Sequence, residues 1–385
     1  MNKIIEKIFS TNLIYRWSEL PRPIEFKVSD RESMKAMVAY LLSGYEENIN
    51  YDILIKLSLA SIFRKSIITD IKNSIYEYLI KEDVLINEFV YNELEKIILD
   101  KELLIYIKNY DKFESKEKEL LDIAGLIATE YELKYIKEFD SDNFEFKNIF
   151  KSYQERIEIA MENNGYRKFK KNKKIKKIID IINALRFQKR GSRVPIFPSY
   201  SVLSHMYFVA VINYFLTREY MMKNKIYDKS LIETKIYYNF YASLFHDLLE
   251  SLTRDIISPL KQKISKLDKA LEKYELKLLD ENILPNIPSK LKSEFKKFLI
   301  KPFSNKLIIG NNIEYDVSDD IMLYNKGIDG KLLKVGDDLS AYFEIIKNPY
   351  TDFNSELKTA KERIKEKYRN VRIYNLNVFE YFDEK

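Results

Sequence analysis

Apolar residues recur every three to four positions along most of the chain, which is the spacing of amphipathic helices. The segments YDILIKLSLASIF (51–63) and KELLDIAGLIATEYELKYI (118–136) show this spacing clearly. Strand-like alternation is scarce. The best example is NKLIIGNNIEYDVS (305–318), where two apolar runs flank Gly310 and Asn311, as in a hairpin. The pattern therefore predicts a mostly α protein with one short β-hairpin.

Composition sharpens this picture and narrows the chemistry. A chain of 385 residues predicts two domains, or one large one, at about 150 residues per domain. The chain has only 8 glycines and 9 prolines, which favours long helices. It has no cysteine, which excludes disulfides, iron–sulfur clusters, thiolate zinc sites and a cysteine nucleophile. Any metal must therefore be held by His, Asp and Glu.

Charge and hydropathy favour a cytoplasmic protein without membrane attachment. The N-terminus has no signal-peptide pattern, and the longest apolar-rich run, MYFVAVINYFL (206–216), has 11 residues and predicts a buried helix. The net charge of +6 is only mildly basic. The most basic stretch, 166–179, is interpreted as a linker or helix start. The alternative is a surface for nucleic acid or an acidic partner, although Tyr166 and Phe169 are too few for a stacking platform.

Three segments of the N-terminal half are similar to segments of the C-terminal half, in the same order. This order predicts an ancient duplication, and chance similarity among Ile- and Lys-rich helices is the alternative. The paired segments are 33–42 with 205–216, 59–71 with 241–253, and 124–157 with 336–364.

The only two histidines of the chain provide the candidate chemistry. His246 is followed by Asp247, and Glu250 comes four residues after the histidine. On one continuous helix, His246 and Glu250 share a face, and so do Asp247 and Glu250. His205 lies in the apolar segment SVLSHMYFVAVINYF, where it is either a core residue or a ligand. Mixed His and carboxylate ligands suit divalent Mn, Co, Fe, Ni or Zn.

These residues resemble the HD-domain metal-dependent phosphohydrolases, in which the pattern H…HD…D is formed here by His205, His246-Asp247 and Asp337. The resemblance is closer to the 5′-deoxynucleotidase branch, whose motif helix reads HD-x-x-E-x-x-T-x-D and is followed by Pro-x-Lys. This chain reads HDLLESLTRD (246–255) and then Pro-Leu-Lys (259–261). The family's final aspartate opens a D-x-L-x-A-Y helix, matched here by DDLSAY (337–342). The resemblance covers roughly residues 180–365.

The resemblance implies one divalent metal, which could be Mn, Co, Ni, Fe, Zn or Mg. Its implied ligands are His205, His246, Asp247 and Asp337, with Asp338 as the alternative to Asp337. It further implies that Glu250 handles the proton passed to or from water and the leaving alkoxide, and that Asp247 is catalytic as well as a metal ligand. The alternative for Glu250 is an ordinary exposed helix residue.

The resemblance also implies substrate contacts. Asp255 would recognise the sugar and Lys261 would bind substrate, and an arginine upstream of His205 would grip the phosphate. Arg190 is the best placed, and the alternatives are Arg186 and Arg193. The family usually has Arg-Trp here, whereas this chain has Arg190 followed by glycine. Asp255 could instead make a local hydrogen bond at a helix end, and Thr253 is interpreted as structural.

The predicted repeat assigns a different character to the N-terminal half. Its counterparts of the four ligands are Ser33, Arg64, Lys65 and Gly125, so every ligand position is lost. We therefore predict a degenerate, non-catalytic HD-like helical domain over 1–160, a basic linker or helix over 161–180, and an HD-type phosphohydrolase domain over 181–385. Arg16-Trp17 resembles the family's upstream Arg-Trp pair. The chain is expected to be a monomer with a pseudo-dimeric repeat, or a homodimer.

The expected function is a phosphohydrolase that releases phosphate from a (deoxy)nucleoside 5′-monophosphate by attack of metal-activated water. Two alternatives remain open. One keeps the metal and fold but acts on nucleoside triphosphates, cyclic nucleotides or nucleic-acid ends. The other is a non-catalytic scaffold that binds nucleotides or nucleic acid.

Overall fold

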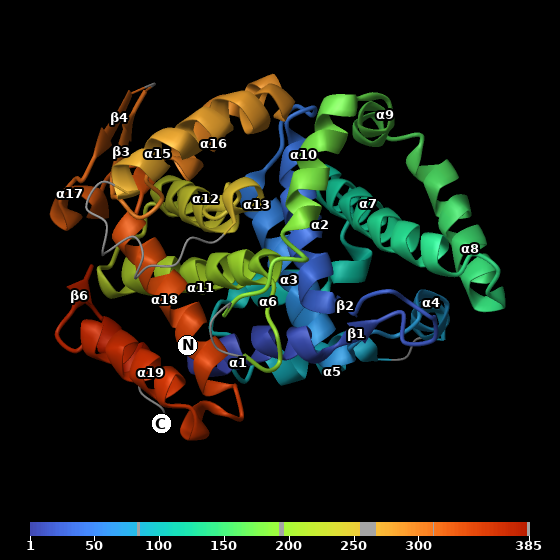
Figure 1. The fold of residues 1–385 in the computed structure, drawn as a ribbon, viewed down its shortest axis with the longest axis horizontal. Helices are drawn as coiled ribbons and strands as arrows, with labels where there is room; N and C mark the ends of the chain where they lie inside the picture. Colours follow the sequence, from blue (N-terminus) through green and yellow to red (C-terminus); the bar gives the residue numbers. More distant parts are fainter. Residues whose placement is uncertain (83–84, 192–195, 255–266, 311, 383–385) are drawn as a thin grey trace. The chain divides into compact units, whose positions relative to one another are not determined.

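The computed structural model describes residues 1–82, 85–191, 196–254, 267–310 and 312–382 (Figure 1). Within it the chain divides into two compact units, Met1–Lys171 and Asn172–Lys385. The division falls inside the basic segment 161–180. It separates two short helices, α9 (Asn164–Lys171) and α10 (Lys173–Ala184), which belong to different units.

The N-terminal unit is almost entirely helical. Its one pair of strands among the described residues is β1 with β2, which are antiparallel with Arg16 opposite Phe26. The elements of this unit are α1 (Asn2–Ser10), β1 (Tyr15–Arg16), β2 (Phe26–Lys27), α2 (Val28–Ser43), α3 (Tyr51–Ile68), α4 (Asn73–Lys81), α5 (Ile86–Leu94), α6 (Lys101–Lys108), α7 (Lys116–Phe139), α8 (Phe144–Ala160) and α9.

Three helices form the centre of this unit, because α2, α3 and α7 all contact one another. Side chains of α2 are buried on every side of the helix, as expected for a helix surrounded by protein. Side-chain caps start the other two helices: Asn50 accepts from the backbone N–H groups of residues 52 and 53, and Ser115 accepts from that of Lys118. The helices predicted over 51–63 and 118–136 are confirmed.

The C-terminal unit is also mostly helical, with two small sheets. Its elements are α10, α11 (Val202–Lys223), α12 (Lys229–Phe245), α13 (Glu250–Thr253), α15 (Leu267–Leu278), α16 (Lys292–Leu299), β3 (Lys306–Ile309), β4 (Asn312–Tyr315), α17 (Asp319–Leu323), β5 (Gly327–Ile328), α18 (Gly330–Ile346), α19 (Ser355–Lys367), β6 (Arg372–Ile373) and β7 (Leu376–Asn377).

Helix α11 is the centre of this unit and contacts both α12 and α18. Nearly all of its side chains are buried, so the prediction of a buried helix over 206–216 is confirmed. Its close approach to α18 depends on Gly336, because a Cβ at that position would lie 2.4 Å from Nδ2 of Asn213 on α11. The sequence therefore fixes the distance between the two helices that carry His205 and Asp337.

The predicted hairpin over 305–318 is confirmed. Strands β3 and β4 are antiparallel, with Lys306 opposite Tyr315, and β5 adds a third strand on the other side of β3. Gly310 turns the chain at a φ of +59°, where a side chain would be strained. The expected mostly α fold is therefore confirmed. Among the described helices, none combines the length and the apolar character needed to cross a membrane.

The motif segment FHDLLESLTRD does not form one continuous helix, so this prediction is wrong. Helix α12 ends at Phe245, residues 246–249 form turns, and α13 begins at Glu250. The backbone bonds here mostly join residues three apart, as from Glu250 N to Asp247 O at 3.0 Å. Such a tightened turn aligns residues i and i+3, so the backbone pairs Asp247 with Glu250 rather than His246 with Glu250.

Two surface features of the N-terminal unit stand apart from its core. In the basic stretch, Tyr166 and Phe169 are buried, so neither ring is free to stack on a base.

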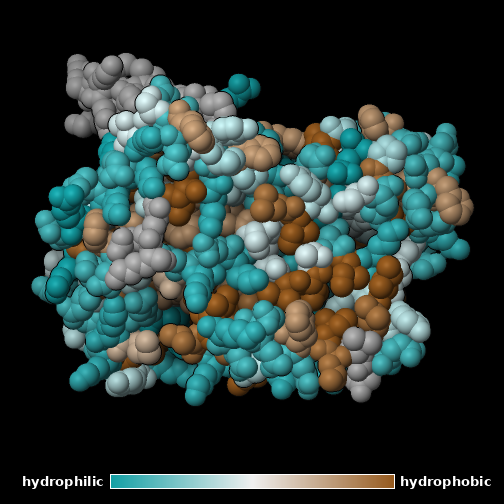
Figure 2. Space-filling view, turned by 90° about the horizontal axis from the view of Figure 1, so that it is seen from below, coloured by the Kyte–Doolittle hydropathy of each residue, from teal (hydrophilic) through white to brown (hydrophobic). Residues whose placement is uncertain are grey.

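Near α5, apolar side chains line a hollow of about 500 Å³, and Figure 2 shows apolar surface gathered on the face that carries α1 and α5. The lining residues are Ile67, Ile68, Ile71, Leu79, Leu85, Ile86 and Phe89.

Candidate metal centre

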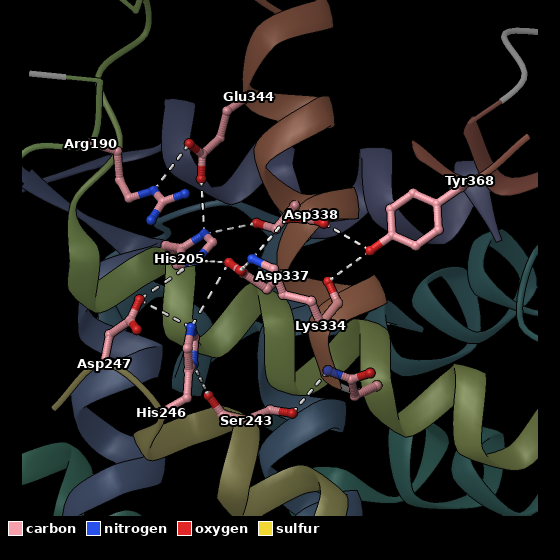
Figure 3. A network of polar contacts seen from close by, with 12 residues as sticks. Arg190, His205, Ser243, His246, Asp247, Lys334, Asp337, Asp338, Glu344 and Tyr368 are labelled. Atoms are coloured by element: carbon pink, nitrogen blue, oxygen red, sulfur yellow. Dashed lines mark hydrogen bonds and ion pairs between the residues drawn. The ribbon is translucent and has the colours of Figure 1, made fainter. Parts of the chain in front are cut away.

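His205, His246 and Asp337 converge in the C-terminal unit although more than 130 positions separate the first from the last. His205 lies in the first turn of α11, His246 directly follows α12, and Asp337 lies in the middle of α18 (Figure 3). One ligand atom from each of the three lies within 4.8 Å of the other two. The segments that the sequence pattern links are thus brought to one point by the contacts of α11 with its two neighbours.

The contact distances match those between ligands of a single ion. Nε2 of His205 lies 3.0 Å from Oδ1 of Asp337, and Nε2 of His246 lies 4.0 Å from the same oxygen. Asp247 joins the group, because its Oδ2 lies 3.0 Å from Nε2 of His246 and 4.0 Å from Nε2 of His205. Two atoms that each bind one ion at about 2.1 Å lie about 3 to 4 Å apart.

Both imidazoles are held from behind so that Nε2 faces the centre. Nδ1 of His246 lies 2.7 Å from the backbone carbonyl of Ser243, to which it donates. Nδ1 of His205 lies 3.0 Å from Oε1 of Glu344 and 3.1 Å from Oγ of Ser340. A carboxylate or carbonyl behind a histidine fixes the tautomer that metal ligation needs and raises the basicity of the ring.

Nε2 of His246 is the atom of this centre that points most directly to a metal ion. Nε2 of His246 is buried and has no hydrogen-bond partner among the described residues. The Asp247 oxygen 3.0 Å away makes an ionic contact with it but does not have the geometry of a hydrogen bond. A buried nitrogen lone pair without a donor is costly, and a metal ion is a ligand that would satisfy it. The residues present therefore fit a divalent ion.

The charges of the centre also favour a cation. Burial would lower the pKa of His246, but Asp247 and Asp337 outweigh it and raise the pKa to about 9. Burial would likewise raise the pKa of Asp337, but Lys334 and the two imidazoles hold it well below its ordinary value. The two shifts are complementary, because the carboxylates stabilise a positive charge at His246 and the neighbouring cations stabilise the negative charge of Asp337.

Asp338 faces away from the two histidines. Tyr368 donates to its Oδ2 at 2.8 Å, and Lys367 pairs with the same oxygen. Its Oδ1 lies 3.0 Å from Nζ of Lys334. Asp337, rather than the alternative Asp338, is therefore the residue of this pair that reaches the centre. It lies two turns into α18 and does not open that helix, as the motif would suggest.

Arg190 is the predicted arginine that the fold brings to the centre. Its backbone pairs with Tyr200 just before α11, and its Nε donates to Oε2 of Glu344 at 3.3 Å. The structure records no bond from its two terminal nitrogens to a described residue. Burial would lower the pKa of Arg190, but Glu344, Asp337, Asp247 and Glu250 outweigh it and raise the pKa. Arg190 thus carries a permanent charge beside four carboxylates.

The other predicted substrate residues have different outcomes. Arg186 is buried in the core of its unit at 2% exposure. Glu250 begins α13, and its charge is one of those that raise the pKa of Arg190. Thr253 ends that helix, and its hydroxyl lies 3.3 Å from the carbonyl of Leu249. The predicted residues Asp255, Lys261 and Arg193 lie outside the described residues.

A comparison with family models gives the centre its context. A model described as 5′-deoxynucleotidase YfbR-like matches residues 177–384, which is more than half of the chain. The chain belongs to this family. A search of curated proteins found no sequence that matches it. The YfbR-like family implies a metal-dependent hydrolase of the HD type that acts on nucleotides, and with it a divalent metal.

Two residues of the centre were missed by the sequence analysis. Glu344 binds His205 and Arg190 at once, and Lys334 donates to Oδ2 of Asp337 at 2.6 Å. Helical spacing could have found both, because they lie seven residues after and three residues before Asp337 on the same helix. Burial would lower the pKa of Lys334, but the carboxylates of Asp337 and Asp338 raise it.

Proposed function

We propose that this chain is a metal-dependent phosphomonoesterase that releases phosphate from a (deoxy)nucleoside 5′-monophosphate. The observation that carries the proposal is the convergence of His205, His246 and Asp337, with Asp247 beside them. Membership in the YfbR-like family supports the nucleotide as substrate. When bound, a divalent ion lowers the pKa of water and polarises a phosphate oxygen.

The chain's own residues divide the remaining tasks. The two histidines, Asp247 and Asp337 would hold the ion, and the acceptors behind the imidazoles keep each Nε2 directed at it. Arg190 would bind the phosphate, because Glu344 fixes its Nε and leaves the two-nitrogen fork of the guanidinium for two phosphate oxygens.

Glu250 would carry the proton between water and the leaving oxygen of the sugar. Its position supports this role. Glu250 begins α13, its backbone N–H donates to the carbonyl of Asp247 in a tight turn, and its charge helps to raise the pKa of Arg190. Asp255 and Lys261 remain the proposed contacts for the sugar and the rest of the substrate, on the resemblance to the family.

The test is an assay of phosphate release from nucleoside mono-, di- and triphosphates and cyclic nucleotides, each with Mn, Co, Ni, Zn or Mg. The proposal expects release from 5′-monophosphates with at least one metal. It expects loss of activity in Glu250→Gln with bound metal retained, measured by metal analysis of the purified protein. Glu281→Gln is the matched control, because Glu281 is 57% exposed and pairs only loosely with Lys277.

Each other outcome has a defined meaning. Hydrolysis confined to triphosphates, cyclic nucleotides or nucleic-acid ends would replace the substrate and keep the chemistry. Full activity in Glu250→Gln would remove the assigned proton carrier. Metal binding without hydrolysis of any nucleotide would leave the protein as a binding scaffold and refute the proposal.

A further inference from the structure

The N-terminal unit contains a cluster of buried charges that its helical core does not need. The cluster, called here the cation cluster, combines residues from β1, α2, α3 and α7 and from the loop that follows α3. Its members are the cations Arg16, Arg31, Lys35 and Lys65 and the carboxylates Glu32, Asp70 and Glu132.

Each carboxylate of the cation cluster already has close partners. Glu132 accepts from Nε of Arg16 at 2.9 Å and from the indole N–H of Trp17 at 2.8 Å. Asp70 lies 3.1 Å from the same arginine. Glu32 accepts from Arg31 at 2.5 Å, from Ser61 at 2.6 Å and from Lys35 at 3.4 Å. The three negative charges are therefore satisfied.

Two donors of the cation cluster remain open. Nζ of Lys65 lies 4.0 Å from its nearest paired carboxylate oxygen, on Asp70, and within the described part of the chain makes only a long hydrogen bond of 3.4 Å to the carbonyl of Thr69. Nε of Arg31 is buried without a hydrogen-bond partner among the described residues. Four cations face three carboxylates, so one positive charge is in surplus. Buried cations of this kind ordinarily have an anionic partner.

The open donors are within reach of solvent. The side chains of Lys65 and Arg31 are 24% and 18% exposed, respectively, and Trp17, which donates to Glu132 of the cluster, is partly exposed. Trp17 also has a φ of +58°, a region that bulky residues avoid and that is often found at functional sites. Arg16 lies over its ring, with the guanidinium carbon 4.9 Å from the ring centroid.

The predicted repeat aligns this cluster with the metal centre of the other unit. Lys65 is the counterpart of Asp247, and Gly125 is the counterpart of Asp337. At Gly125 the missing side chain leaves room for Arg31, whose terminal nitrogen lies 3.0 Å from the place where a Cβ would be. Where one unit offers carboxylates to a cation, the other offers cations.

We propose that the N-terminal unit binds a phosphate group, free or esterified, through Lys65 and Arg31. A phosphate dianion supplies several acceptor oxygens and would neutralise the surplus charge, and a guanidinium and an ammonium are the side chains suited to it. Burial lowers the pKa of Lys65 to about 8, and Arg31 and Arg16 add to this effect, so a bound anion would relieve the repulsion. This binding site is independent of the hydrolytic function proposed above.

Trp17 makes the test specific, because it is the only tryptophan of the chain and lies in this unit. The full-length protein would be titrated with inorganic phosphate and with a nucleoside 5′-monophosphate at constant ionic strength and followed by tryptophan fluorescence. Equilibrium dialysis with labelled phosphate, in an Arg190→Gln background that removes the proposed phosphate ligand of the other unit, would count bound phosphate directly. We expect saturable binding to one site in both measurements.

The variants separate this site from general charge effects. Lys65→Gln and Arg31→Gln should each weaken binding at least about tenfold, the loss expected for a charge-assisted hydrogen bond, and Lys65→Arg should retain it. Lys96→Gln removes one charge from an exposed pair with Glu93 in the same unit and should bind like the parent protein. Circular dichroism would confirm that each variant is folded.

The two ligand arms identify the source of the phosphate. Tighter binding of the nucleotide than of inorganic phosphate would identify a nucleotide ligand, and equal affinity would identify free phosphate. If dialysis finds no phosphate retained, or if folded Lys65→Gln retains as much as the parent protein, the proposal is refuted.

Discussion

The two units of this chain differ in the charge that they hold at the positions aligned by the predicted duplication. In the C-terminal unit, two imidazoles and two carboxylates converge, and Nε2 of His246 has no hydrogen-bond partner among the residues that the structure describes. In the N-terminal unit, the aligned positions hold Lys65 and a glycine covered by Arg31. A site built from carboxylates and imidazoles needs an exchangeable cation, whereas side chains supply the cations of the other site permanently. The difference separates a centre suited to metal chemistry from one suited to anion binding.

Each unit contains its own ion pair between an arginine and a glutamate, and the predicted duplication would have kept this pair. Arg190 pairs with Glu344, and Arg16 pairs with Glu132. The offset that aligns Gly125 with Asp337 also aligns Glu132 with Glu344. The residue after each arginine has positive φ, +73° at Gly191 and +58° at Trp17. The glycine adopts this turn without strain, which gives a backbone reason for the lack of tryptophan at 191.

The largest expected effect comes from removing a proposed metal ligand. Asp337→Ala should lower phosphate release on the order of 10³-fold, because a metal contributes several kcal/mol of charge stabilisation and each 1.4 kcal/mol is about tenfold in rate. Ser33→Ala, at the aligned position of His205 in the other unit, should leave release unchanged. Equal losses in the two variants would contradict the division of roles between the units. The measurement is the steady-state rate of phosphate release at saturating metal.

A smaller effect is expected at Glu344, the residue behind His205. Glu344→Gln should weaken metal binding by about 10- to 100-fold, as for other side chains that orient a metal-binding histidine. Excess metal should restore part of the rate, which a merely structural defect would not allow. Glu132→Gln is the matched change in the other unit and should leave metal affinity unaffected. Metal titration by calorimetry would measure both.

Gly336 and Gly125, at the positions that the predicted duplication places close to each other, differ in how tightly they are packed. Gly336→Ala should destabilise the fold by about 1 to 3 kcal/mol, the usual cost of overpacking, because the new Cβ meets the fixed side chain of Asn213. Asn213 is held by a 2.9 Å hydrogen bond to Ser243. Gly125→Ala meets only the end of the flexible Arg31 side chain and should cost less. Chemical denaturation of both variants would show whether the order is reversed.

An effect on stability of similar size but opposite sign is expected on removing the charge of Lys65. Its pKa falls from 10.5 to about 8 in the folded protein, so at pH 7 the folded state bears the full cost of a buried ammonium. Lys65→Gln should therefore raise the unfolding free energy at pH 7 by about 2 kcal/mol, allowing for partial exposure. The gain should shrink as the pH rises above 8 and vanish above about 10.5, where the folded and unfolded lysine are both neutral. Denaturation curves at pH 7 and pH 10 would measure it, and a gain that stays constant with pH would show that burial does not cause it.

The order of residues was enough to predict the mostly α fold and the convergence of His205, His246 and Asp337. Helical periodicity predicted α3, α7 and the buried α11, and the Gly-Asn turn predicted the hairpin of β3 and β4. The spacing of the two histidines and Asp337, read with the family motif, indicated which side chains would converge. The helices and the hairpin follow from the periodicity and the residue types of single segments. The converging residues follow from the resemblance to the family.

Tertiary structure decided the features that depend on distant contacts. The turn after Phe245 replaces a continuous helix, because the packing of His246 against the Ser243 carbonyl and a tightened backbone set the direction of Asp247. Glu344 and Lys334 acquire their roles only when α18 lies against α11. Arg31 fills the space over Gly125 from another helix. Each of these depends on which surfaces meet, and the periodicity of a single segment carries no information about its partner.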